Sequence, residues 1–117
     1  MKIVINSDWG GFSLSDEAFE RYLIEKETPF RKVPNRYGFY FYENGPNSVG
    51  DDTDIMLWDM EIERNDPVLV RIVEEMGEDA NGTHASLKIV EIPEDVEWEI
   101  DEYDGMEHVA EKHRTWR

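Results

Sequence analysis

Apolar side chains recur along this chain at two spacings, every second residue and every third or fourth residue, which predict strands and helices respectively. Residues 2–6 form a short β-branched run typical of a buried strand, and residues 87–92 form a second run closed by Pro93. Residues 96–101 alternate apolar with acidic side chains, which predicts a strand with one face buried and one in water. Residues 37–42 are almost wholly aromatic and also favour a strand.

Two segments have the spacing and the end signals of helices. The first follows Ser15, a good N-cap, and is expected to end near Lys26. The second has Asp66 as its N-cap and Pro67 at its first helical position, and Gly77 can end it. The residues expected to face the core are Phe19, Tyr22 and Leu23 in the first helix, and Val68, Leu69, Ile72, Val73 and Met76 in the second.

The remaining segments are expected to connect or extend these elements. Pro29 and Pro34 bracket a basic connector, and residues 43–54 are rich in the Asn, Gly, Pro, Ser and Asp of exposed loops. Residues 55–62 are expected to re-enter the sheet. Residues 106–116 fit either a final strand or a short helix, because their periodicity favours neither.

The resulting order β, α, β, β, α, β, β favours an α+β fold with a mostly antiparallel sheet of about five or six strands and two helices. A chain of 117 residues has room for one domain, so residues 1–117 are expected to form a single α+β domain. No apolar run approaches the roughly 20 residues of a membrane span. The absence of cysteine fits a reducing compartment, so a folded cytoplasmic protein is expected.

Acidic residues dominate the charge of the chain. Twelve Lys and Arg stand against 28 Asp and Glu, a formal net charge of -16, which disfavours direct binding to duplex DNA or to a membrane surface. Residues 91–107 include nine acids and no Lys or Arg, so a sheet face formed there is expected to be strongly negative. Basic residues gather in residues 21–36 and again in residues 108–117, where an anion could bind.

Motifs of catalysis and metal binding are not evident in the sequence. No Gly-x-Ser-x-Gly, Walker or His-Glu-x-x-His motif occurs, so no catalytic residue and no cofactor are predicted. Two of the three histidines, His108 and His113, are five residues apart and fall on different faces of a helix or strand, which disfavours zinc. Asp51, Asp52 and Asp54 lack the Glu that completes an EF-hand loop, so a solvated turn is favoured there over calcium.

Two short segments could contact a nucleotide. Gly10 and Gly11 lie between a strand and a helix N-terminus, where backbone N–H groups can point at an anion while Trp9 and Phe12 stack on a base. The alternative is a tight turn in which Phe12 anchors the helix to the core. At the other end, guanidinium groups and an indole suit phosphate and adenine, the alternative being a frayed terminus. These residues are Lys112, His113, Arg114, Trp116 and Arg117.

Three segments together resemble a family of small phage and prophage proteins whose characterised members are similar to the first Thoeris anti-defence family. They are KIVIN with GGFSLS at residues 2–6 and 10–15, LKIVEIP followed by VEWEI at residues 87–100, and EKHRTW at residues 111–116. Such proteins are sponges for immune signals. The resemblance implies an α+β homo-oligomer, a hexamer, that binds cyclic ADP-ribose-type signals in the host cell cytoplasm without cleaving them. Some members also hold cyclic oligonucleotides.

The resemblance also implies the residues of the ligand site. It carries over to the glycine turn and the terminal arginines, so the implied contacts are Gly10, Gly11, Phe12, Arg114 and Arg117. Further candidates, outside what the resemblance implies, are Trp9, Arg64 and His113. A sponge needs tight binding from preformed aromatic and guanidinium contacts, often across a subunit boundary, and no catalytic group.

Two other functions remain open at this stage. The first is an acidic mimic of DNA that occupies a host DNA-binding enzyme, because carboxylates at strand spacing can echo the spacing of phosphates. The carboxylates in question are Glu97, Glu99, Asp101 and Asp104. The second is an enzyme that degrades the signal, which the lack of a nucleophile or metal motif disfavours.

Overall fold

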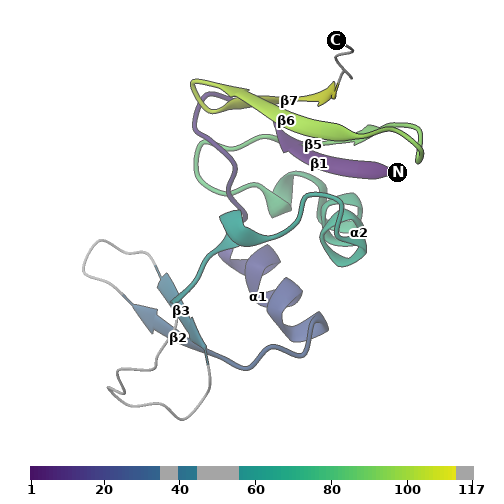
Figure 1. Cartoon of the computed structure of the whole chain (residues 1–117). Coiled ribbons are helices and arrows are strands. Elements are labelled where there is room, and N and C mark those ends of the chain that lie inside the picture. Colours follow the sequence, from purple (N-terminus) through teal and green to yellow (C-terminus); the bar gives the residue numbers. More distant parts are fainter. Residues whose placement is uncertain (35–39, 45–55, 113–117) are drawn as a thin grey trace.

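Helices and antiparallel strands alternate irregularly along the chain, which confirms the α+β class (Figure 1). The computed structural model describes residues 1–34, 40–44 and 56–112. In order, the elements are β1 (Lys2–Asn6), α1 (Asp16–Glu25), β2 (Phe30–Pro34), β3 (Tyr40–Asn44), β4 (Met56–Leu57), the 3₁₀ turn η1 (Asp59–Glu61), α2 (Pro67–Met76), the 3₁₀ turn η2 (Gly77–Ala80), β5 (Leu87–Glu91), β6 (Trp98–Tyr103) and β7 (Met106–Glu111).

The described strands form three antiparallel ladders rather than one continuous sheet. These are β1 with β5, β2 with β3 and β4, and the hairpin of β6 with β7. The second edge of β1 does not pair with the backbone of another strand that the structure describes. The Val4 N–H donates to the Arg64 carbonyl at 2.8 Å, and the Asn6 N–H donates to the Glu107 side chain at 2.8 Å. The hairpin therefore lies over β1 and β5, on the side away from α2 (Figure 1).

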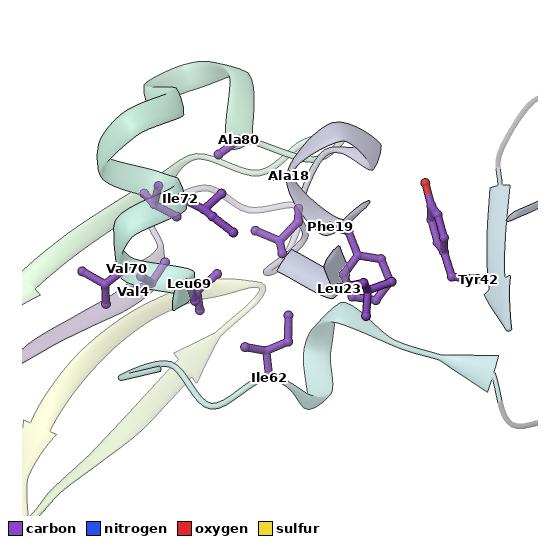
Figure 2. Close-up of a cluster of buried hydrophobic side chains, with 12 residues drawn as sticks. Val4, Ala18, Phe19, Leu23, Tyr42, Ile62, Leu69, Val70, Ile72 and Ala80 are labelled. Atoms are coloured by element: carbon purple, nitrogen blue, oxygen red, sulfur yellow. The ribbon is translucent and has the colours of Figure 1, made fainter. Parts of the chain in front are cut away.

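The main hydrophobic core lies between α1, α2 and the β1–β5 ladder (Figure 2). Leu69 and Ile72 of α2 are fully buried, and Phe19 of α1 meets the Tyr42 ring edge-on with centroids 5.1 Å apart. The buried faces expected for both helices are confirmed. Tyr22, Val68 and Met76 are partly buried and pack on the edge of this core. Its buried residues are Val4, Leu14, Ala18, Phe19, Leu23, Tyr42, Ile62, Leu69, Val70, Ile72, Val73 and Ala80.

Several expected segments take a different form in the structure. The connector expected between the two prolines is strand β2, because the aromatic strand β3 pairs with it along its length. The strand expected over residues 55–62 is reduced to the two residues of β4, because the chain then turns into η1. The Asp59 carboxylate of η1 accepts a hydrogen bond from the Leu14 N–H at 2.8 Å. The first two residues of the loop expected at residues 43–54 belong to β3, and residues 45–54 lie outside the described residues. The segment from residue 106, expected to be a strand or a short helix, is strand β7 over Met106–Glu111, and its residues 113–116 lie outside the described residues.

Both helix N-caps are confirmed, and Asp66 has further partners. Its carboxylate accepts from the Val68 N–H at 2.8 Å and from the Tyr22 hydroxyl at 2.8 Å, and Lys26 Nζ lies 3.0 Å away. Burial raises the pKa of Asp66, but the hydrogen bonds from Tyr22, Lys26 and the Val68 N–H outweigh burial and leave the pKa lowered. The ionised carboxylate therefore stabilises the fold.

Replacing this cap is expected to have a pH-dependent effect. Asp66→Ala should cost about 1–2 kcal/mol of unfolding free energy at pH 7. Because the folded-state pKa is lowered, the contribution of the charge is present above the ordinary value of 3.8 and is lost as pH falls through the lowered value. Asp66→Asn, which keeps the cap acceptor without the charge, should therefore differ from wild type at pH 7 and approach it only as the pH falls from 3.8 through the lowered pKa. Urea denaturation at pH 7 and over a series of acidic pH values measures this, and a pH-independent difference would contradict it.

Candidate functional site

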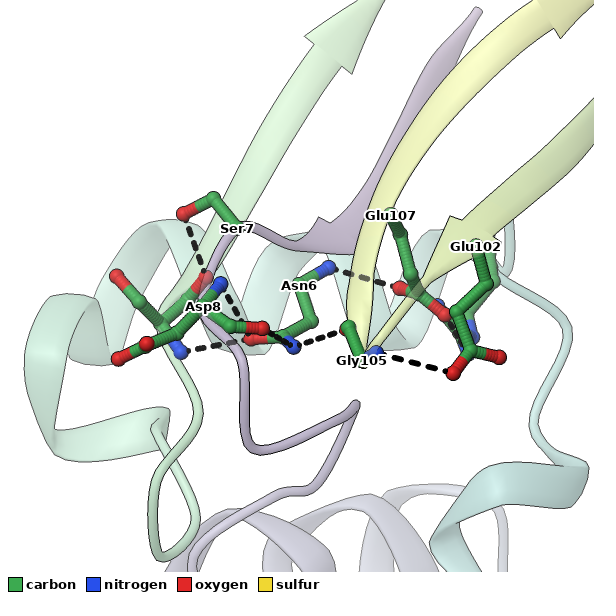
Figure 3. A network of polar contacts seen from close by, with 8 residues as sticks. Asn6, Ser7, Asp8, Glu102, Gly105 and Glu107 are labelled. Carbon is green, nitrogen blue, oxygen red and sulfur yellow. Dashed lines mark hydrogen bonds and ion pairs between the residues drawn. The ribbon is translucent and has the colours of Figure 1, made fainter.

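The turn after β1 and the turn between β6 and β7 meet around one buried side chain, Asn6 (Figure 3). Its Nδ2 donates to the carbonyls of Asp8 and Gly105, each at 2.7 Å. Its Oδ1 accepts from the N–H of Asp8 at 3.2 Å and of Ser86 at 2.9 Å. Asn6 is 0% exposed, so these four bonds tie three segments of the chain together without a competing solvent contact.

Glycine is required where the turn after β1 packs against the hairpin turn and against the loop before β5. A Cβ on Gly105 would lie 2.1 Å from the Trp9 carbonyl oxygen, and a Cβ on Gly10 would lie 2.1 Å from the His84 carbonyl oxygen. Gly11 has a positive φ of 87°, and no atom lies within 4 Å of its Cβ position. Glycine therefore suits the backbone conformation of the turn there and is not needed to make room for a neighbouring atom. The two-glycine turn is therefore a packing element of this end of the molecule.

Phe12 and Arg64, both predicted as ligand contacts, touch each other in the structure. The Arg64 guanidinium carbon lies 3.6 Å from the centroid of the Phe12 ring. Phe12 is also partly buried against the core, as in the alternative in which it anchors the helix. Arg64 donates to both carboxylate oxygens of Glu107, at 2.5 Å and 2.9 Å. The two side chains are only 15% and 7% exposed, so this is a largely buried, bidentate ion pair.

Glu107 links the ion pair to the Asn6 cluster. One of its carboxylate oxygens accepts both from Arg64 and from the Asn6 N–H. The sequence did not predict this role, because residues 91–107 contain many acidic residues and no local pattern distinguishes Glu107 from the exposed ones. The Asp104–Gly105 turn was the available signal, since that turn sets the register in which Glu107 of β7 pairs opposite Glu102 of β6.

Trp9 stands at the outer rim of the same region. It is 58% exposed, and its ring meets Tyr103 edge-on with centroids 6.3 Å apart and an interplanar angle of 69°. Tyr103 is 75% exposed, the largest value among the large hydrophobic side chains that the structure describes. Tyr103 carries no local sequence signal of this contact, because its proximity to Trp9 follows from the Asn6 contacts rather than from its own neighbours in the chain.

The structure thus brings five of the predicted residues to one end of the molecule: Trp9, Gly10, Gly11, Phe12 and Arg64. The other three, His113, Arg114 and Arg117, lie outside the described residues. Within residues 1–34, 40–44 and 56–112, no three candidate metal ligands gather at one point. No helix in that part of the chain has the length and apolar character to span a membrane.

Comparisons with known proteins find no match among family models, curated proteins or solved structures.

Proposed function

We propose that this protein binds a cyclic ADP-ribose-type signal, and in a related manner cyclic oligonucleotides, and sequesters it without cleaving it. The observation that supports this is the contact between Phe12 and Arg64 at 3.6 Å, beside the glycine turn. A guanidinium is suited to phosphate oxygens and an aromatic ring to a nucleobase, so the pair offers both kinds of contact that a nucleotide needs.

The Glu107 contact would prepare Arg64 for this role. Arg64 has five N–H donors, and its two hydrogen bonds to Glu107 hold the plane of the guanidinium over Phe12. A ligand phosphate would take donors that Glu107 does not use. Holding the group in place before binding lowers the entropy lost on binding, which favours tight retention.

The net charge of -16 requires that this attraction be local. Repulsion between the chain as a whole and an anion is screened beyond about 8–10 Å at physiological salt, and the remaining Arg64 N–H groups donate to a phosphate only at contact distance. Assembly into a homo-oligomer, as the resemblance implies, belongs to the proposal because a boundary between copies could add further contacts.

The proposal is tested by capture and release. The purified protein is incubated with cyclic ADP-ribose isomers and cyclic di- and trinucleotides, freed of unbound ligand by filtration, and heated, and the released compounds are identified by mass spectrometry. We expect an intact ligand from the wild type and at least about tenfold less from Arg64→Gln, the loss expected for a charged hydrogen bond. Arg71→Gln is the matched control, because Arg71 is 52% exposed and pairs with Glu25 instead. A cleaved product, or a filtrate that retains the whole panel, would contradict the proposal.

A second candidate, the acidic mimic of DNA, is favoured by one observation. Glu97, Glu99 and Asp101 are all exposed and alternate along β6 and the residue before it, which places them on one face. Under this candidate the nucleotide panel would stay unbound, and the protein would displace duplex DNA from a DNA-binding enzyme. A Glu99→Gln, Asp101→Asn variant would lose that competition.

A further inference from the structure

Two exposed aromatic side chains, Trp9 and Tyr103, stand together on the tips of two turns. Trp9 follows β1, and Tyr103 ends β6 at the hairpin turn, and Figure 1 shows both turns at the same end of the molecule. Their exposed fractions of 58% and 75% are high for side chains of this size. Because the two rings are inclined by 69°, Tyr103 can cover at most one face of the Trp9 indole, and at least one face is left free of it.

The backbone that carries these rings is firmly held. Asn6 bonds to the carbonyls of Asp8 and Gly105, so a residue one position from Trp9 and a residue two positions from Tyr103 are tied to one buried side chain. The close approach of Gly105 to the Trp9 carbonyl fixes the spacing of the turns. A binding surface on such a support loses little conformational entropy when a partner arrives.

Exposed carboxylates surround the two rings. Asp8 precedes Trp9, and Glu102 and Asp104 flank Tyr103, and all three residues are exposed. Asp8 accepts the Trp9 N–H through one oxygen, and Glu102 accepts the Gly105 N–H through one oxygen, so each keeps a second oxygen for a partner. We name these five residues, Asp8, Trp9, Glu102, Tyr103 and Asp104, the aromatic–acidic patch. The nearby guanidinium of Arg64 is already paired with Glu107 and does not neutralise the patch.

We propose that the aromatic–acidic patch docks an arginine side chain presented by a basic segment of a partner protein. A guanidinium can stack flat on the indole face while its N–H groups donate to the surrounding carboxylates. The local charge of three carboxylates opposes a phosphate at this point, which separates the patch from the ligand site assigned to Phe12 and Arg64. Both rings project from turn tips, and such a protruding surface suits a protein partner, because small molecules bind in concave sites. The inference does not depend on the proposed function.

The test uses the full chain and two peptide probes, hexa-arginine and hexa-lysine, in calorimetric titration at 150 mM salt. The expected result is tighter binding of hexa-arginine, because lysine lacks the planar group that stacks on the indole. Trp9→Ala and Tyr103→Ala should each weaken hexa-arginine binding about five- to tenfold without changing the net charge. Trp58→Ala is the matched control, since Trp58 is 45% exposed and belongs to a different surface, next to Leu57 and Phe19. Asp104→Asn, which keeps a residue tolerant of the positive φ of 51°, should weaken binding two- to fivefold.

Four results would overturn the assignment. Equal affinity for the two peptides, or equal loss in Trp9→Ala and Trp58→Ala, would mean that the acidic surface attracts any polycation. Loss of a nucleotide rather than of the peptide on Trp9→Ala would make the patch part of a base-binding site. Self-association of the wild type that Trp9→Ala abolishes in sedimentation, with unchanged peptide binding, would identify a second copy as the occupant. Folding of each variant is checked by its urea midpoint.

Discussion

Alanine at Gly105 is expected to destabilise the protein by at least about 3 kcal/mol, while alanine at Gly11 should cost only about 1–2 kcal/mol. The two positions have nearly the same positive φ, 89° and 87°, so the backbone strain of a side chain is matched between them. The two positions differ in how close other atoms lie to a built Cβ. A Cβ on Gly105 would lie 2.1 Å from the Trp9 carbonyl oxygen, whereas nothing lies within 4 Å of the Cβ position on Gly11. The difference between the variants therefore isolates the close approach of the two turns.

Urea denaturation of both variants at pH 7 measures this difference. Gly105→Ala should also move the Trp9 turn away from the hairpin, so its Asn6 contacts should loosen and the amides of residues 8 and 105 should exchange with solvent faster. Equal unfolding free energies for the two variants would show that the hairpin turn tolerates displacement and that the turns do not constrain each other.

Removing the Glu107 side chain is expected to have the second large effect, a loss of about 3–5 kcal/mol for Glu107→Ala. The variant would leave the Arg64 guanidinium, 15% exposed, without its bidentate partner, and would leave the Asn6 N–H without an acceptor. Glu107→Gln retains an acceptor for that N–H and removes only the charge, so a smaller loss of about 1.5–3 kcal/mol is expected.

A double-mutant cycle checks that the loss comes from the pair. Arg64→Ala and Glu107→Ala should be strongly non-additive, with a coupling of about 1–3 kcal/mol, because each single variant strands the other charge. As a control, the exposed pair formed by Lys2 and Glu74 should show a coupling below about 1 kcal/mol. Additive losses at Arg64 and Glu107 would mean that solvent reaches the pair and that each side chain acts independently.

The sequence predicted both helices because their signals are local. Ser15 and Asp66 accept hydrogen bonds from backbone N–H groups two or three residues away, as N-caps do. Strands β1, β5 and β6 were likewise predicted from the alternation and β-branching of their own residues. Strand β2 was not, because its mixed basic and apolar residues form a strand only in contact with the aromatic strand β3.

The candidate site was predicted in part, for a related reason. Trp9, Phe12 and the glycine turn were selected because glycines between a strand and a helix, flanked by aromatic residues, are visible within a few positions of the chain. The residues that contact them in the folded protein could not be predicted from the sequence. Glu107 and Tyr103 gain their contacts with Arg64 and Trp9 only when the β6–β7 hairpin lies over β1.

The sequence alone determined the helices, most of the strands, the α+β class and the acidic surface, because caps, side-chain spacing and charge act over a few residues. Only the tertiary structure decided that the strands divide into three ladders and that Asn6, Arg64 and Glu107 meet. These contacts join residues far apart in the chain. They depend on loop closure and on the packing of whole elements, for which no local pattern of residues carries a signal.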